Sequence, residues 1–395
     1  MKFVVIFLNL LVFVTCHELK QVLILSRHNI RTPLTANLEK FTSYPWPKWN
    51  KSVGYLTEKG ALMEEYMGEY FYKWLVRTKL FEDGCPDKNS TLIYANTKQR
   101  TRESAKAFVR GAFLNCNISV FSLDSEEMDP IFNPVLCDDA KVVKDLIINE
   151  MEIKLRDLDL RKSYLELEEI LNLKDSEICK MEGQCNLADT IDEISYEIGK
   201  EPNVHGPLDW GNAIIDSFLM SYYDGYAIED VAWGRIKNSK QWETLTQITK
   251  ENQNVRFNST LLAREVAKPL LAYISSVLND EKQLRFILLN GHDSNINSLM
   301  ASLGIKGYLL PEQYETTPIG GKLVFEKWYD NVLNKNLLKM EFVYLTVKQL
   351  RDGSKLSLNN TPRWVQLSMN DCPIDLNGFC PWEDFIKVLK NVSGV

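Results

Sequence analysis

The stretch VLILSRHNIRTPL, Val22 to Leu34, places a histidine between two arginines directly after a run of apolar residues. Its first four residues are apolar, which is typical of a short strand buried on both faces of an α/β sheet. His28 then lies between Arg27 and Arg31, in a chain that has only four histidines. Because arginine forks match the oxygens of phosphate, the stretch predicts a strand that ends at an anion site.

Two further apolar runs show the same pattern, STLIYAN at 90–96 and RFILLN at 285–290. Arg100 follows the first of these runs, and His292 and Asp293 follow the second. In doubly wound sheets, ligands bind at the carboxyl ends of the strands, so we expect the three strand ends to converge on one crevice. Three arginines, two histidines and one aspartate at such a crevice predict a phosphate pocket.

These residue types suit phosphoryl transfer. An imidazole nitrogen of His28 can attack phosphorus, and a covalent intermediate divides one difficult displacement into two easier ones. The arginines and a protonated His292 would stabilise charge, and Asp293 would protonate the leaving alkoxide. We therefore expect the fastest turnover in mildly acidic solution, where Asp293 begins protonated while His28 keeps a free nitrogen. No C-x-x-C or H-E-x-x-H spacing occurs, so no metal or other cofactor is expected and EDTA should leave activity intact.

Composition and charge bound the remaining possibilities. The chain has 395 residues, enough for two domains or one large domain with an insertion. Its net charge of −7 makes a nucleic-acid partner a poor expectation. Residues 1–16 combine a cationic head with an apolar run too short for a membrane span, which predicts a signal peptide. We expect an exported protein that begins near His17 and is secreted or extracellular, or periplasmic if the source is bacterial.

The pattern along the chain divides it into an α/β part and a helical part. Helices are expected after Thr57 and after Arg100, and a crossover helix is expected over 261–279. From about residue 138 the sequence becomes charged, periodic as in helices and poor in strand signals. We therefore predict an α/β domain over 17–137 and 260–395, with an all-helical insertion domain over 138–259.

The cysteines form a disulfide framework if the protein is exported. Cys179 with Cys185, and Cys372 with Cys380, can each close a small loop, while Cys85 with Cys116 can form a longer bridge. Cys137 would then be free. Asn-x-Ser/Thr glycosylation sequons, which are compatible with secretion through a glycosylating pathway, occur at Asn50, Asn89, Asn117, Asn258, Asn359 and Asn391.

The motifs RHNIRTP at 27–33 and GHD at 291–293 carry a family resemblance. Together they resemble the histidine acid phosphatase family, whose general signature has Gly where this chain has Asn29. Asn occurs there in the glucose-1-phosphatase branch, which the chain resembles from about residue 21 to its end, through stretches such as MDPIFNPV, TPIGGK and CPIDLNGFC. The resemblance implies a histidine-phosphatase-type α/β sheet sandwiched by helices, with a smaller all-α domain inserted over the crevice.

The resemblance also implies a role for each site residue. His28 would be the nucleophile and Asp293 the proton donor, which would afterwards activate water to hydrolyse the phosphohistidine. The phosphate oxygens would be held by Arg27, Arg31, Arg100 and His292. Glu201, in KEPNVHGPL, matches a position that closes the sugar end of the pocket in this branch.

Three functions of different kinds stay open at this point. The favoured one is an exported phosphomonoesterase that hydrolyses small sugar phosphates such as glucose 1-phosphate. The second is a broad-specificity acid phosphatase or phytase, because the residues that bind the phosphate do not determine which leaving group the enzyme accepts. The third is a catalytically silent relative that binds a small ligand, although none of the expected catalytic residues is missing. The sequence leaves the oligomeric state undetermined.

Overall fold

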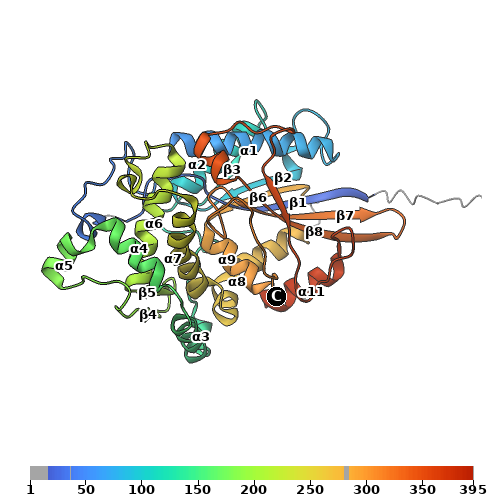
Figure 1. The fold of residues 1–395 in the computed structure, drawn as a ribbon. Helices are drawn as coiled ribbons and strands as arrows, with labels where there is room; N and C mark the ends of the chain where they lie inside the picture. The colour runs from blue at the N-terminus through green and yellow to red at the C-terminus, as the bar shows by residue number, and fades with distance from the viewer. Residues whose placement is uncertain (1–16, 36, 280–283, 395) are drawn as a thin grey trace, which may run out of the picture.

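The computed structural model describes residues 17–35, 37–279 and 284–394, and Figure 1 shows its ribbon. The predicted signal peptide over 1–16 lies outside the described residues. Within those residues, no helix combines the length and the apolar character needed to cross a membrane.

One mixed sheet forms the centre of the described chain. Its eight strands follow the order β10-β8-β7-β1-β6-β2-β3, with β9 paired to β8. Their bounds are β1 His17–Arg27, β2 Thr91–Ala95, β3 Val120–Phe121, β6 Phe286–Gly291, β7 Lys322–Asp330, β8 Lys335–Tyr344, β9 Arg363–Gln366 and β10 Cys380–Pro381. The three predicted strands are confirmed as β1, β2 and β6, and β1 pairs in parallel with β6, which pairs in parallel with β2.

Helices cover both faces of this sheet (Figure 1). Side chains alternate along β1, so Val22 and Ile24 pack toward α1 and α2, whereas Leu23 and Leu25 pack toward α8 and α11. The bounds of the helices around the sheet are α1 Glu58–Arg77, α2 Gln99–Ala112, α8 Thr260–Leu278, α9 Asp293–Ser302, α10 Val347–Asp352 and α11 Trp382–Ser393. Both faces are buried, which explains the nearly continuous apolar runs of the parallel strands.

The predicted helix starts are also found. Thr57 caps α1, with its side-chain oxygen accepting a hydrogen bond from the backbone N–H of Gly60. Helix α2 crosses α1 closely, because a Cβ atom at Gly68 or Gly111 would collide with the backbone of the other helix. This packing fixes the first turn of α2, which carries Arg100, beside the segment that follows β1.

The segment 138–259 is mostly helical and stands at one side of the sheet (Figure 1). Its helices are α3 Lys144–Arg156, α4 Arg161–Leu171, α5 Glu177–Glu182, α6 Pro207–Asp224 and α7 Ser239–Phe257. The expectation of an all-α segment was wrong in one respect, because β4 (Glu193–Ser195) and β5 (Asn203–His205) form an antiparallel pair. Each strand has only three residues, too few for a periodic signal in the sequence. The boundaries of a separate insertion domain stay a prediction.

Three disulfides join the predicted cysteine pairs, namely Cys85–Cys116, Cys179–Cys185 and Cys372–Cys380. Among the described residues, Cys137 is the cysteine that remains free, as expected. The first bridge joins the loop before β2 to the loop after α2, and therefore holds both ends of the β2–α2 unit that carries Arg100.

Candidate active site

A cavity of about 390 Å³ lies where the strand ends meet the helical segment. All seven site residues expected from the sequence line it. Six of them, which we call the strand-end half, lie at the end of β1 or in the segments that follow β1, β2 and β6, and these are Arg27, His28, Arg31, Arg100, His292 and Asp293. The opposite wall, which we call the helical half, comes from residues 201–257 and includes Glu201, Asp209, Asn212, Asp216, Thr249, Lys250, Gln253 and Arg256.

His28 is buried directly after β1, and its ring is oriented by the backbone. Its Nδ1 lies 2.9 Å from the carbonyl oxygen of Asn29, which can only accept a hydrogen bond. Nδ1 therefore carries the proton and Nε2 keeps a lone pair. Burial, followed by the positive charge of Arg100 and Arg31, holds the pKa of His28 well below its ordinary value. The ring is therefore neutral, with a free nitrogen, even in mildly acidic solution.

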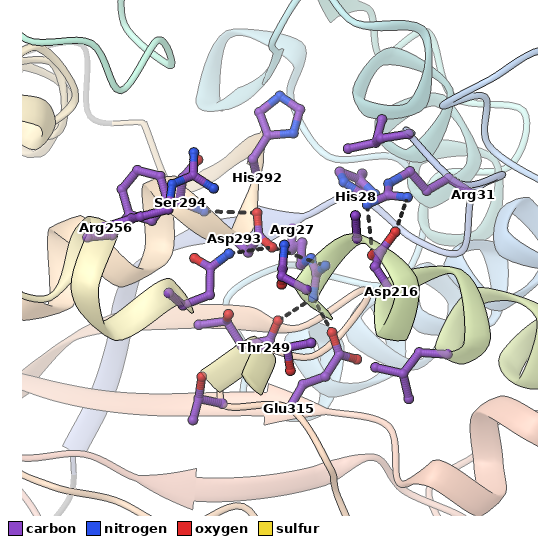
Figure 2. A pocket seen from close by; sticks show the side chains of 18 of the residues that line it. Arg27, His28, Arg31, Asp216, Thr249, Arg256, His292, Asp293, Ser294 and Glu315 are labelled. Carbon is purple, nitrogen blue, oxygen red and sulfur yellow. Dashed lines mark hydrogen bonds and ion pairs between the residues drawn. The ribbon is translucent and has the colours of Figure 1, made fainter. Parts of the chain in front are cut away.

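Arg27 lies between two carboxylates (Figure 2). One terminal nitrogen lies 3.1 Å from Asp293 Oδ2, and the other donates to Glu315 Oε1 and to the carbonyl of Thr317, each at 2.6 Å. Burial alone would lower the pKa of Arg27, but Asp293 and Glu315 raise it. Its charge is therefore fixed, and its guanidinium holds Asp293 at the cavity wall.

Asp293 is the first residue of α9, and its Oδ1 accepts the backbone N–H of Ser294 at 3.0 Å. Burial acts to raise the pKa of Asp293, yet the surrounding positive charge, chiefly that of Arg27, outweighs it, so the pKa is lowered. The helix N-terminus also favours the carboxylate. In the empty site Asp293 is therefore ionised. It can act as an acid only when a bound anion offsets the surrounding positive charge.

The other two arginines differ in their partners. Arg31 forms a two-pronged ion pair with Asp216 of α6, with N–O distances of 2.9 and 3.0 Å. Arg100 has no such carboxylate partner among the described residues, and its nearest polar contact is His292 Nδ1 at 3.5 Å. Burial and then Arg31 lower the pKa of Arg100 to about 10, so it stays charged at neutral pH. A charged fork without a carboxylate is a ready binding group for an incoming oxyanion.

His292 closes the strand-end half beside His28, with ring centroids 5.4 Å apart. It precedes α9, and its backbone N–H donates to Asn295 Oδ1 at 2.9 Å. Its Nε2 lies 2.9 Å from Asn96 Nδ2, at the end of β2. Burial and then Arg100 hold the pKa of His292 well below its ordinary value. The ring is therefore neutral in the empty site, in contrast to the protonated ring expected from the sequence.

Asn29 stabilises the loop that carries His28 through the hydrogen bonds of its side chain. Its Nδ2 donates to Glu64 Oε2 at 2.8 Å, and its Oδ1 accepts the backbone N–H of Ile30 at 2.9 Å. Glu64 forms an ion pair with Lys322, with both side chains fully buried. Lys322 also donates to Ser26 Oγ at 2.8 Å. This network ties the nucleophile loop to β7 and α1, so glycine is not required at position 29 of this chain.

The helical half carries residues that contact the strand-end half. Glu201, which lies in the loop between β4 and β5 rather than on a helix, pairs with Arg256 at 3.0 Å. Burial raises the pKa of Glu201 although Arg256 opposes this. Gln253 of α7 accepts from Asn297 Nδ2 at 2.9 Å and places its own Nε2 3.5 Å from Asp293 Oδ2. The helical half is therefore polar, and through Gln253 it contacts the carboxylate of Asp293.

Several of these contacts were not predicted from the sequence. Asp216, Gln253 and Glu315 all contact the predicted arginines or Asp293, yet none of them follows a buried strand. Asp216 and Gln253 lie on amphipathic helices, where a polar residue is more often on a solvated face. Asn96 is the last residue of the run 90–96 and directly follows β2, so the strand-end argument that selected Arg100 could have found it.

Known proteins match this chain over most of its length. Residues 18–192 and 233–370 match the histidine phosphatase superfamily, branch 2. The glucose-1-phosphatases of Providencia rettgeri and Salmonella typhimurium are each 41% identical to this chain, covering 94% and 95% of it and 91% and 93% of their own lengths. The structure of the phytase from Citrobacter braakii superimposes with a TM-score of 0.87 at 28% identity, covering 95% of this chain and 98% of that one. The chain is therefore a phosphatase that belongs to the histidine phosphatase superfamily, branch 2.

Proposed function

We propose that the protein is an exported phosphomonoesterase that hydrolyses small sugar phosphates, with glucose 1-phosphate as its preferred substrate. The observation that carries this proposal is a buried histidine with a free Nε2, facing three arginines at one end of a cavity whose other end is acidic and polar. The 41% identity to two glucose-1-phosphatases supports the same substrate.

The reaction begins at His28. Its Nε2 lone pair attacks phosphorus, the N–P bond forms and the bond from phosphorus to the sugar oxygen breaks. Arg27, Arg31 and Arg100 hold the phosphate oxygens and stabilise the charge that develops on them. Asp293 gives its proton to the leaving sugar oxygen. The ionised Asp293 then takes a proton from water, which attacks the phosphohistidine and releases inorganic phosphate and free His28.

Substrate binding itself supplies the proton donor. In the empty site the arginines hold the pKa of Asp293 low. A phosphate anion among them neutralises much of that positive charge, so the pKa of Asp293 rises when substrate binds. His28 needs no such change, because burial and the arginines already keep its nitrogen free.

The charges of the cavity favour a substrate with one phosphate. At the phosphate end, three arginines of the strand-end half meet two carboxylates among the described lining residues, Asp293 and Glu315, both of which contact Arg27. The helical half instead has three carboxylates, Glu201, Asp209 and Asp216, against Lys250 and Arg256. Carboxylates accept hydrogen bonds from sugar hydroxyls but repel further phosphates. This balance supports a sugar monophosphate over an inositol polyphosphate, which would need positive charge along the whole cavity.

The alternative is a broad acid phosphatase or phytase, which the likeness to the Citrobacter braakii phytase favours. The deciding assay compares phosphate release from glucose 1-phosphate, phytate and an aryl phosphate, with His28→Ala as the control. Selective turnover of glucose 1-phosphate that disappears in His28→Ala is expected. Equal turnover of all three substrates would support the generalist. No turnover by the folded protein would support a silent ligand-binding relative.

Export is the second part of the proposal. Three disulfides support it, because such bonds persist mainly in oxidising compartments. The N-terminal residues predict the signal peptide that would direct it. Mass spectrometry of the protein recovered outside the cytoplasm should find a chain that starts near His17. A chain that retains Met1 and stays in the cytoplasm with reduced cysteines would contradict export.

A further inference from the structure

Asn96 is fully buried at the end of β2, and its side-chain amide has a fixed orientation. Its Oδ1 accepts hydrogen bonds from the backbone N–H of Thr97 at 2.7 Å and of Asp129 at 3.0 Å. Backbone N–H groups can only donate, so the oxygen of the amide must face them. The Nδ2 group must then face His292 Nε2, which lies 2.9 Å away.

This orientation determines where the proton of His292 sits. Asn96 Nδ2 can only donate, so His292 Nε2 must accept and cannot carry a hydrogen. In a neutral imidazole the proton is then on Nδ1. A doubly protonated ring would set an N–H of His292 against the N–H groups of Asn96 in a buried site, where two opposed donors are costly.

We propose that Asn96 is a positioning residue that holds His292 as a neutral imidazole with its proton on Nδ1, so that Nδ1–H donates to a phosphate oxygen beside Arg100. The proposal rests on the proposed function, because it assigns a role to His292 in binding the phosphoryl group. Nδ1 lies 3.5 Å from a terminal nitrogen of Arg100. In the empty site the N–H of Arg100 is directed at Nδ1 only at this limiting distance, so the 2.9 Å contact of Nε2 with Asn96 decides the tautomer. Nδ1–H and Arg100 are then both donors, and one phosphate oxygen placed between them would accept from both and separate them.

The charges around His292 act in the same direction. Arg100, Arg31 and Arg27 disfavour a second proton on the ring, while Asp293 favours one. Burial disfavours the charged ring more strongly than any of these groups, and the resulting pKa lies well below the ordinary value. His292 therefore serves the phosphate as a neutral hydrogen-bond donor, and the arginines supply the positive charge.

The two active-site histidines then share one tautomer and differ in orientation. His28 directs its Nδ1–H to the Asn29 carbonyl and leaves the Nε2 lone pair for phosphorus. His292 directs its Nε2 lone pair to Asn96 and leaves Nδ1–H for a phosphate oxygen. The backbone partner makes one ring a nucleophile, and the amide partner makes the other a donor.

The direct test is ¹⁵N NMR of the protein labelled at histidine, with and without inorganic phosphate, between pH 5 and pH 8. The chain has four histidines, and the signals of His292 are assigned by their loss in His292→Gln. We expect a protonated Nδ1 and an unprotonated Nε2 throughout this range. An imidazolium, or a ring protonated on Nε2, would overturn the proposal.

Asn96→Asp provides the matched perturbation. The carboxylate can still accept from Thr97 and Asp129, but it faces His292 Nε2 with an acceptor. His292 should then carry a proton on Nε2, becoming an imidazolium at low pH and presenting a bare Nδ1 to phosphate at high pH. The ratio of variant to wild-type affinity for inorganic phosphate should fall about tenfold from pH 5 to pH 8, the effect of one lost hydrogen bond.

Ser122→Ala is the control, because Ser122 bonds the backbone carbonyl of Asn96 and not its amide. It should leave the ¹⁵N signals and the affinity ratio unchanged. A wild-type pattern in Asn96→Asp would overturn the proposal. If that variant does not fold, the wild-type spectrum still decides. The predicted spectrum with no turnover of any phosphate ester would refute the proposed function alone, and turnover with a different tautomer would refute this inference alone.

Discussion

The two walls of the cavity are built on different principles. The strand-end half is made of residues at the ends of buried strands or in the short segments after them, so the register of the sheet sets where these residues meet. The helical half is made of side chains on α6, α7 and the β4–β5 loop. The ion pair of Asp216 with Arg31 joins it to the strand-end half, and the ion pair of Glu201 with Arg256 lies within it. The first wall is mainly basic and suits the phosphate, and the second is mainly acidic and suits a hydroxylated leaving group. Chemistry and substrate choice should therefore be separable by mutation.

The largest expected effect belongs to Asp293→Asn in the strand-end half. Turnover of glucose 1-phosphate should fall about 10²–10⁴-fold, because the sugar oxygen must leave without a proton. For an aryl phosphate with an acidic phenol, the rate of the phosphorylation step should fall much less, since its leaving oxygen needs no proton. Rapid-quench kinetics on both substrates measure the difference. An equal loss for both would show that Asp293 does not donate to the leaving group.

The pH profile separates the two reacting groups of the same half. Because the pKa of His28 is low, its nitrogen is free across the mildly acidic range. Asp293 must be protonated in the bound state, so kcat should fall by about tenfold per pH unit on the alkaline side. Stopped-time assays from pH 3 to pH 9 test this. A rate that climbs steadily through alkaline pH would contradict the role of Asp293.

A smaller effect is expected where the two halves join. Asp216→Ala leaves the buried Arg31 without its carboxylate, and should lower the free energy of unfolding by about 1–2 kcal/mol after allowance for partial exposure. Saturating inorganic phosphate should then raise the melting temperature more in the variant than in the native protein, because phosphate replaces the lost anion. Calorimetry with and without phosphate measures this. An equal rise in both proteins would mean that Arg31 does not grip phosphate.

The smallest expected effect lies in the helical half. Glu201→Gln removes one negative charge near the leaving group while keeping the shape of the side chain. The preference for glucose 1-phosphate over phytate, measured as a ratio of kcat/KM values, should fall about fivefold, as expected for a partly exposed charge. The affinity for inorganic phosphate should stay the same. A change in that affinity without a change in preference would move Glu201 from substrate choice to phosphate binding.

The same contrast explains how much could be predicted from the sequence. The apolar runs before His28, Arg100 and His292 predicted three strands, and a shared sheet edge then required their polar ends to meet. Asp216 and Gln253 carry no comparable signal, because helix periodicity does not say which helix faces a crevice. The antiparallel strands β7 and β8 were not predicted, although Lys335–Tyr344 alternates between buried and partly buried residues over much of its length and Lys322–Asp330 contains a short apolar run.

The protonation states of the site histidines could not be predicted from the sequence. His292 was expected to be protonated because a cation suits phosphate. The structure places it in a buried site among three arginines and against an amide, and each of these disfavours a second proton. Such states depend on which polar atoms face one another after folding, and no spacing of residues encodes that directly.

The central claim is that His28 becomes phosphorylated during turnover. Rapid-quench trapping with substrate labelled in the phosphate, followed by peptide mapping, tests this most directly. The account predicts an acid-labile, base-stable phosphoryl group on the peptide that contains His28, formed and lost at rates that support turnover. A label on Asp293, or full turnover with no phosphorylated His28 at any time point, would contradict it.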